Sequence, residues 1–378
     1  MKQAIMIGAG NIGRGFIGAI LSRSGYHVTF ADVNMTLIDA INAEGRYTVH
    51  IQDRDPAAFT ITNIDGISSA GPELAEALKT AELVTTAVGL RILPIVAKPI
   101  AARKAAGNTA PLNIVACENA VRATSQLKNA VYALLDDETK AFADANVGFA
   151  DCAVDRIVPK MDFADPLDVA VEEFSEWDVE RSGWKGELPK IEGMTIVEDL
   201  SAYIERKLFT LNSGHAICAY LGCLRGHQTI LDSVNDPIIG PIVYKAMQQS
   251  GAGLVKKFSM DAEKHQAYID RIFARFHNPY LQDEVARVGR EPIRKLAASD
   301  RLINPLLTAY NFGMKVDQLI FGAAAALRYD NAEDPQSVEL QKTIAEQGAA
   351  AALEQYSGLA ADHPLSTRIL DVYRALAV

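Results

Sequence analysis

The sequence predicts an α/β protein in which an N-terminal, doubly wound parallel sheet precedes a mainly helical domain. The chain opens on a short apolar strand that leads directly into a glycine-rich loop. Its first half then alternates strand and helix patterns, whereas the pattern from Asp199 almost to Val378 is that of helices. A length of 378 residues agrees with two domains of ordinary size.

The first predicted element is a strand followed by the glycine pattern of a dinucleotide-binding loop. Residues 2–7 are mostly apolar, residues 8–13 read G-A-G-N-I-G, and residues 16–24 have the pattern of an amphipathic helix. The first glycine permits a tight turn, the second lets the backbone approach a pyrophosphate, and the third lets the helix pack closely on the sheet. A Rossmann-type domain follows from this order. The expected cofactor-binding residues of the loop are Gly8, Gly10, Asn11, Ile12 and Gly13.

The second predicted strand ends in an acidic residue that selects the cofactor. Residues 27–31 have strand character and lead to Asp32, about twenty residues beyond the glycines. A carboxylate there accepts hydrogen bonds from ribose hydroxyls and repels a 2′-phosphate, so NAD is expected rather than NADP. Methyltransferases and purely structural turns also use glycine loops, but Asp32 favours the dinucleotide.

Four further strands are predicted in the first half. Residues 46–51 and 59–63 form an inserted strand pair, and residues 83–88 and 112–117 are buried parallel strands. Because the carboxyl ends of such strands border the ligand crevice, Asn119 becomes a candidate site residue. The alternative is that Asn119 bonds its own backbone in a turn.

Glycine and proline become frequent in residues 182–193, which marks the expected domain boundary. We therefore predict a dinucleotide-binding domain at residues 1–190 and a helical substrate-binding and catalytic domain at residues 191–378.

Three polar residues interrupt an apolar helical stretch just after this boundary. Lys207, Asn212 and His215 stand at K-x4-N-x2-H spacing. At about 100° per residue, Asn212 lies roughly 140° and His215 roughly 80° from Lys207, so the three could line one cavity. An amine that can lose its proton beside an amide donor suits proton removal from an alcohol, which is dehydrogenase chemistry. Alternatively, Lys207 extends to water and the other two make ordinary core hydrogen bonds.

The four cysteines show no disulfide pattern and are expected to be reduced thiols. Some alcohol dehydrogenases use zinc, and Cys218, Cys223, His215 and His227 lie near one another in the sequence. Their spacing matches no usual zinc pattern, so packing of small buried thiols is the favoured interpretation.

The composition is that of a water-soluble enzyme. A net charge of −10 argues against a nucleic-acid partner, although a local basic pocket could still hold an anionic substrate. No run reaches the roughly 18 apolar residues that a membrane span needs, and the short N-terminal apolar run does not fit a signal peptide. A cytoplasmic location without membrane partners is expected.

Several motifs together resemble the polyol-specific long-chain dehydrogenases. They are the glycine loop 8–18, A-C-E-N at 116–119, A-V-D-R-I-V-P at 153–159, R-K-L-F-T-L-N-S-G-H at 206–215, R-F-H-N-P at 275–279 and R-V-G-R-E-P-I-R-K at 287–295. The motifs stand in the same order over nearly the whole chain. The resemblance implies interconversion of mannitol 1-phosphate and fructose 6-phosphate with NAD and without a catalytic metal.

The resemblance also implies roles for individual residues. Lys207 would be the general base, Asn212 and Asn119 would hold the substrate oxygen, and His215 would orient it. Some relatives carry a carboxylate three positions before the lysine, which is thought to help a proton reach solvent. Ile204 occupies that position here, so the proton needs another exit route.

Recognition of a substrate phosphate must come largely from cations. The basic residues of the matching motif and just beyond it are Arg290, Arg294, Lys295 and Arg301. We hypothesise that they bind the phosphate, the alternative being a solvated basic face. Asp155 and Arg156 are further candidates for the substrate site, or partners in an internal salt bridge.

Two other functions fit parts of the sequence. A dehydrogenase of a free polyol or a sugar acid, of the mannitol 2-dehydrogenase or fructuronate reductase type, would use the same loop and lysine. A catalytically silent NAD-binding module would not need Lys207, Asn212 and His215 together.

Overall fold

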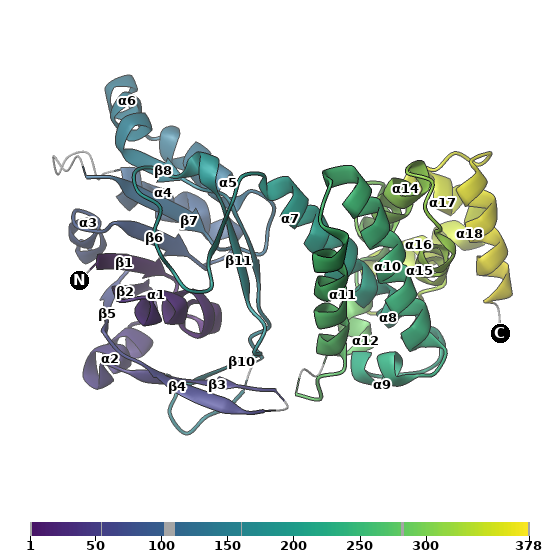
Figure 1. Cartoon of the computed structure of the whole chain (residues 1–378), viewed down its shortest axis with the longest axis horizontal. Coiled ribbons are helices and arrows are strands. Elements are labelled where there is room, and N and C mark those ends of the chain that lie inside the picture. Colours follow the sequence, from purple (N-terminus) through teal and green to yellow (C-terminus); the bar gives the residue numbers. More distant parts are fainter. Residues whose placement is uncertain (1, 54, 102–109, 160, 281–282, 377–378) are drawn as a thin grey trace. The chain divides into compact units, whose positions relative to one another are not determined.

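The computed structural model describes residues 2–53, 55–101, 110–159, 161–280 and 283–376. The chain divides into two compact units between Tyr203 and Ile204. The first unit is built around a parallel sheet and the second is helical (Figure 1), which confirms the predicted fold class.

The first unit contains strands and helices in alternation. Its strands are β1 (Lys2–Ile7), β2 (Tyr26–Asp32), β3 (Tyr47–Ile51), β4 (Ala57–Ile61), β5 (Ile64–Ser68), β6 (Leu83–Thr86), β7 (Leu112–Ala116), β8 (Val147–Phe149), β9 (Cys152–Asp155), β10 (Val169–Val171), β11 (Glu176–Glu180) and β12 (Thr195–Val197). Its helices are α1 (Ala19–Arg23), α2 (Met35–Glu44), α3 (Glu73–Ala77), α4 (Leu93–Ala101), α5 (Ala123–Tyr132) and α6 (Asp137–Asn146).

The central sheet has the order β5-β2-β1-β6-β7-β8, and every neighbouring pair is parallel. The strand order reverses between β1 and β6, which is where open α/β sheets bind ligands. Ile7 pairs with Ala31 and Thr86, and Thr86 pairs with Ala116. The carboxyl ends of β2, β1, β6 and β7 are therefore level along one edge.

The predicted inserted strand pair is present as β3 and β4, which are antiparallel. Sequence analysis missed their third strand, β10, which pairs with β3 in parallel from more than a hundred residues later. A second small sheet has the order β12-β11-β9.

The helix after the glycine loop differs from its prediction as an amphipathic helix over residues 16–24. It begins with a π-helical turn, Gly13–Gly18, continues as α1, and is buried on every side from Gly13 to Ser22. The β3–β4–β10 sheet supplies part of the cover, since Val49, Val169 and Val171 belong to the same hydrophobic core as the helix. A helix packed between two sheets has no face that needs polar residues.

The second unit is a bundle of helices that follows α7 (Leu200–Lys207), the helix in which the two units divide. The others are α8 (Ser213–Leu224), α9 (Ile230–Asn235), α10 (Ile239–Phe258), α11 (Ala262–Phe276), α12 (Val285–Gly289), α13 (Pro292–Leu296), α14 (Ile303–Asn311), α15 (Asp317–Leu327), α16 (Pro335–Gln347), α17 (Ala349–Ser357) and α18 (Pro364–Ala375). Helix α8 is almost wholly buried, and it packs against α10 and α15. Among the described helices, none is both long and apolar enough to cross a bilayer.

His265 of α11 is buried in this bundle without a hydrogen-bond partner for either ring nitrogen among the described residues. Its pKa falls from 6.5 to about 4, chiefly because burial disfavours the charged form and also because Arg206 is nearby. The unfolded chain, whose histidine keeps the ordinary pKa, therefore binds a proton first as the pH falls.

We expect the free energy of unfolding to drop by about 2–3 kcal/mol from this residue alone as the pH is lowered from 6.5 to 4. Denaturant unfolding of the wild type and of His265→Leu at several pH values measures this contribution. The difference between the two proteins should change across that window, and a constant difference would contradict the assignment.

Candidate active site

The glycine loop after β1 satisfies steric demands that only glycine can meet at two positions. Gly8 has φ +102°, and a Cβ added to it would lie 2.5 Å from the carbonyl oxygen of Ala87. A Cβ on Gly13 would lie 2.0 Å from the carbonyl oxygen of Gly8. A Cβ on Gly10 would meet nothing within 4 Å, so the backbone there is open to a ligand.

The carboxylate of Asp32 is fixed against this loop at the end of β2. One oxygen accepts a hydrogen bond from the amide of Ala9 at 2.7 Å, and the other accepts from the amide of Asn34 at 2.9 Å. These two bonds set the direction of the carboxylate and leave it partly exposed at the edge of the sheet. This is the position from which a ribose would be held.

Arg14 supports the loop from beneath, and sequence analysis did not single it out. Its guanidinium is 4% exposed and donates to the carbonyl oxygens of Ala9 and, at 3.0 Å, Leu167. Burial lowers its pKa, although Tyr47, Asp32 and other nearby acidic groups oppose the shift. The loop is therefore braced by a segment about 150 residues away in sequence, a pairing that no local pattern reveals.

Apolar side chains lie exposed along the same edge of the sheet. Ile12 in the glycine loop is 47% exposed, Val33 after β2 is 74% exposed, and Leu90 after β6 is 41% exposed. Asn11 is also exposed. Apolar side chains around convergent polar groups are typical of ligand sites.

The other site candidates of the first unit lie at the ends of β7 and β9. Asn119 is exposed, whereas Asp155 is buried. The guanidinium of Arg156 donates to the carbonyl oxygens of Glu172, at 3.0 and 2.9 Å, and of Gly15 at 3.3 Å. Burial lowers the pKa of Arg156 to about 10. In this structure Arg156 thus links the β10 segment to the helix after the glycine loop.

In the second unit, Lys207 directly precedes a π-helical turn, Leu208–Asn212, and Asn212 is its last residue. In a regular α-helix the two side chains would lie roughly 140° apart. In a π turn the backbone hydrogen bond joins residues five positions apart, so the later residue lies nearly above the earlier one along the helix axis. The turn therefore brings Asn212 toward the face of Lys207 more closely than the sequence predicts.

Serine hydroxyls support this wide turn. Ser213 Oγ donates to the carbonyl oxygen of Leu208 at 2.9 Å, and Ser250 Oγ of α10 donates to that of Phe209 at 2.8 Å. Carbonyls that a π turn displaces from the regular helical ladder thus gain side-chain partners. The hydroxyl of Thr210 is buried and has no partner among the described residues.

His215 is held in one orientation by an acidic residue that sequence analysis missed. Its Nε2 lies 3.2 Å from Oδ2 of Asp283, and its ring stacks on Phe276 with centroids 5.2 Å apart. Burial raises the pKa of Asp283, but hydrogen bonds from His215 and Arg287 outweigh that effect and lower it. A carboxylate paired with a histidine fixes the ring and its tautomer. A lone aspartate gives no signal of such a role in the sequence.

The predicted phosphate-binding cations divide into exposed and buried members. Arg290 is exposed, whereas Lys295 is 4% exposed and its ammonium donates to the carbonyl oxygens of Val288 and Arg290. The pKa of Lys295 falls to about 7, first through burial and then through the charges of Arg301 and Arg294. These cations are therefore close enough to repel one another.

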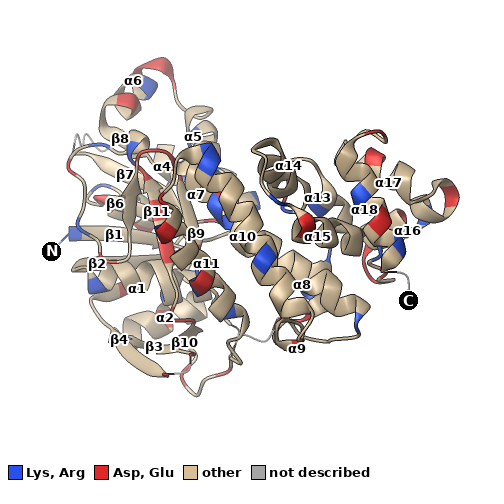
Figure 2. Cartoon of the chain, turned by 45° about the vertical axis from the view of Figure 1, so that its right-hand side comes forward, with Lys and Arg blue, Asp and Glu red and all other residues tan. Residues whose placement is uncertain are grey.

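Two members of this cluster have fixed partners. Arg294 is exposed and lies 2.8 Å from a carboxylate oxygen of Glu291 and 3.6 Å from one of Asp300. The carbonyl oxygen of Arg301 accepts a hydrogen bond from Ser213 Oγ at 2.6 Å. The cluster is thus tied directly to the first turn of α8, which carries His215. Figure 2 shows basic residues in blue near α13 with acidic residues close by.

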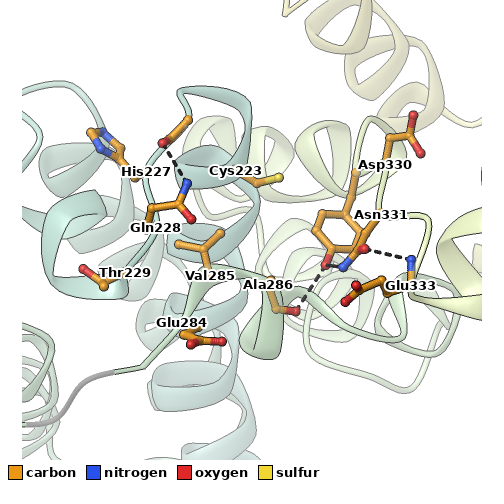
Figure 3. Close-up of a pocket in the computed structure, with 12 residues that line it drawn as sticks. Cys223, His227, Gln228, Thr229, Glu284, Val285, Ala286, Asp330, Asn331 and Glu333 are labelled. Atoms are coloured by element: carbon orange, nitrogen blue, oxygen red, sulfur yellow. Dashed lines mark hydrogen bonds between the residues drawn. The ribbon is translucent and has the colours of Figure 1, made fainter.

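A cavity of about 520 Å³ opens elsewhere in the second unit (Figure 3). Tyr329 lines this cavity and donates to the carbonyl oxygen of Ala286 at 3.2 Å, while the side chain of Asn331 donates to the Tyr329 hydroxyl at 3.0 Å. Glu284 and Cys223 also line it. None of the predicted catalytic residues is among its lining residues.

Of the four residues considered for zinc, the two histidines are paired with carboxylates and Cys218 is buried. Cys218 is buried, and burial raises its pKa to about 12. His227 lies 3.0 Å from Asp236, and His215 is paired with Asp283. In the part of the chain that the structure describes, no three histidine, cysteine or acidic side chains are placed to hold a metal ion.

Comparisons with known proteins cover both units. Residues 2–193 match the family model of the mannitol dehydrogenase Rossmann domain, and residues 199–376 match that of the mannitol dehydrogenase C-terminal domain.

Two solved structures are similar to the chain over nearly its whole length. One is mannitol 2-dehydrogenase from Pseudomonas fluorescens in a ternary complex with NAD and D-mannitol, with a TM-score of 0.71 and 17% identity over 99% of this chain and 91% of that one. The other is a substrate-free D-sorbitol dehydrogenase, with a TM-score of 0.74 and 16% identity over 93% of this chain and 94% of that one. At such identities the likeness shows a common fold.

The glycine loop gives a matched pair of variants. Gly13→Ala should lower the free energy of unfolding by about 2 kcal/mol or more, because the new Cβ would clash with the Gly8 carbonyl. Gly10→Ala should change it by less than about 0.5 kcal/mol and yet raise the Kd for a dinucleotide about tenfold or more. Denaturant unfolding and calorimetric titration measure the two effects. Unimpaired binding by Gly10→Ala would show that this backbone does not face the ligand.

Proposed function

The chain belongs to the mannitol dehydrogenase family of oxidoreductases, and on this premise we propose that it is an NAD-dependent mannitol-1-phosphate 5-dehydrogenase. Such an enzyme interconverts mannitol 1-phosphate and fructose 6-phosphate. The observation that carries the proposal is the π turn that turns Asn212 toward the face of Lys207, with His215 held by Asp283 nearby in the same unit.

The residues of α7 and α8 can perform the proton chemistry of this reaction. The Lys207 amine, in its neutral form, accepts the proton of the substrate hydroxyl. The side-chain amide of Asn212 donates a hydrogen bond to the oxygen as it becomes a carbonyl, and we propose that Asn119 does the same. With its Nε2 proton directed at Asp283, His215 presents Nδ1 as an acceptor that orients a substrate hydroxyl.

The first unit supplies the features that a dinucleotide needs. The open backbone at Gly10 suits a pyrophosphate, and the fixed carboxylate of Asp32 suits the two ribose hydroxyls of NAD. Ile12 and Val33 offer apolar surface beside it. NAD, when bound, supplies the hydride acceptor for oxidation of the polyol.

The cation cluster supports a phosphorylated substrate. Arg290 and Arg294 are exposed, and the charges of Arg294 and Arg301 act on the buried amine of Lys295. A phosphate dianion would relieve the repulsion among these groups, and arginine can bind it through two parallel hydrogen bonds. The hydrogen bond from Ser213 to the backbone carbonyl of Arg301 supports a location near the turn that carries His215. Asp155 and Arg156 remain proposed substrate contacts of secondary importance.

The second candidate function is oxidation of a free polyol or a sugar acid. The two similar structures are named for mannitol and sorbitol without phosphate, which favours this alternative. The same lysine and amide would serve it, and the cation cluster would then be a solvated surface.

The proposal predicts that the wild-type enzyme oxidises NADH with fructose 6-phosphate far faster than with fructose. Lys207→Ala should lower kcat by about 10²–10⁴-fold, because the base is lost while the cofactor site is intact. Spectrophotometric assay of NADH at saturating substrate measures both effects. Activity with fructose alone would select the free-polyol function.

A double variant tests the phosphate site separately. Arg290→Ala with Arg294→Ala should reduce the preference for fructose 6-phosphate over fructose by about tenfold or more. Its turnover of fructose should stay unchanged. An unaltered preference would remove these arginines from the substrate site.

A further inference from the structure

Glu118 is a buried carboxylate at the end of β7 that binds the end of the neighbouring strand. It is 7% exposed. Its Oε1 accepts hydrogen bonds from the Thr86 hydroxyl at 2.7 Å and the Val88 amide at 3.0 Å, and its Oε2 accepts from the Gly89 amide at 2.9 Å. One side chain therefore binds three residues, Thr86, Val88 and Gly89, at the end of β6 and just after it.

Both oxygens of Glu118 act as acceptors, which is the behaviour of an ionised carboxylate. Among the described residues, no lysine, arginine or histidine forms an ion pair with it. Burial of an anion without a cation is costly, and three hydrogen-bond donors offset that cost while leaving the negative charge in place. A ligand that brings a positive charge to this place would be bound more tightly because of Glu118.

The position of Glu118 in the sheet indicates which part of a ligand would bring the positive charge. A doubly wound sheet binds the two halves of a dinucleotide on either side of the point where the strand order reverses. Asp32, at the end of β2, lies on the side that receives the adenosine half. Glu118 and the segment 86–89 lie on the other side, at the ends of β7 and β6. That side receives the nicotinamide half.

The segment 86–89 also touches the glycine loop. The carbonyl oxygen of Ala87 lies 2.5 Å from the position that a Cβ of Gly8 would take, and the amide of Ala87 donates to the carbonyl oxygen of Ile7 at 2.9 Å. Gly89 is exposed and has φ +89°, one of several conformations that a glycine adopts at no steric cost. Glu118 restrains this glycine through the hydrogen bond from the Gly89 amide.

We propose that Glu118 is a positioning residue that shapes the segment 86–89 for the nicotinamide half of the cofactor, and that its buried charge makes the site prefer NAD⁺ to NADH. The preference arises because only the oxidised ring is cationic. This inference rests on the proposed function, since it assumes that the first unit binds NAD.

Calorimetric titration of the full chain with NAD⁺ and with NADH tests the proposal. Glu118→Gln removes the negative charge. It also places the NH₂ group of the new side chain, a hydrogen-bond donor, near backbone amides that are themselves donors. It should raise the Kd for NAD⁺ about tenfold and that for NADH about threefold, so that the ratio of the two Kd values shifts about threefold toward NADH. An equal rise in both Kd values, or none, would overturn the preference, because a purely structural role does not distinguish the two redox states.

Thr86→Val is the matched control, because it removes one hydrogen bond and keeps the charge. Both Kd values should rise by the same factor of about two to three. If neither Kd changes in Thr86→Val, the proposed positioning role of Glu118 is wrong. This result can be obtained even if Glu118→Gln does not fold. Wild-type protein that binds neither cofactor would overturn the proposed function itself, whereas normal binding with an unchanged ratio in Glu118→Gln would overturn this inference alone.

Discussion

Close backbone packing at the ends of β1 and β6 is the constraint on which the rest of the first unit depends. Gly8 and Gly13 have no room for a side chain, because backbone carbonyls occupy the space. The loop between them can therefore take one path, and that path leaves the backbone at Gly10 open. Two hydrogen bonds to Ala9 fix the same path. The guanidinium of Arg14 donates to the Ala9 carbonyl oxygen, and the carboxylate of Asp32 accepts from the Ala9 amide. A rigid loop with open amides is what a pyrophosphate requires.

In the second unit, a π-helical turn sets the directions of the polar side chains of the candidate site. An α-helix would direct Lys207 and Asn212 to different faces, whereas the π turn between them brings their faces together. Ser250 and Ser213 accommodate the displaced carbonyls, and Asp283 fixes His215. His215 therefore projects from an almost wholly buried helix, α8, and its direction is set by packing and by Asp283.

Local signals made much of the fold predictable, and long-range contacts explain what sequence analysis missed. The strand, glycine loop and Asp32 are adjacent in the sequence, so their arrangement follows from known turn geometry. Strand β10 has only three residues and its partner is remote, so no periodicity reveals it. The burial of the helix after the loop depends on that same sheet. In the candidate site, the sequence places Lys207, Asn212 and His215 in one helical segment, whereas the π turn within that segment and the contacts of Asp283 and Lys295 have no local signal.

The central claim is that this site transfers a hydride between a polyol phosphate and a nicotinamide cofactor. The most direct test is reduction of fructose 6-phosphate with NADH in which both hydrogens at C4 of the nicotinamide are deuterium, followed by mass spectrometry of the product. The account predicts mannitol 1-phosphate with one deuterium on the carbon that was the ketone. Product without deuterium, or oxidation of NADH without polyol phosphate, would contradict it.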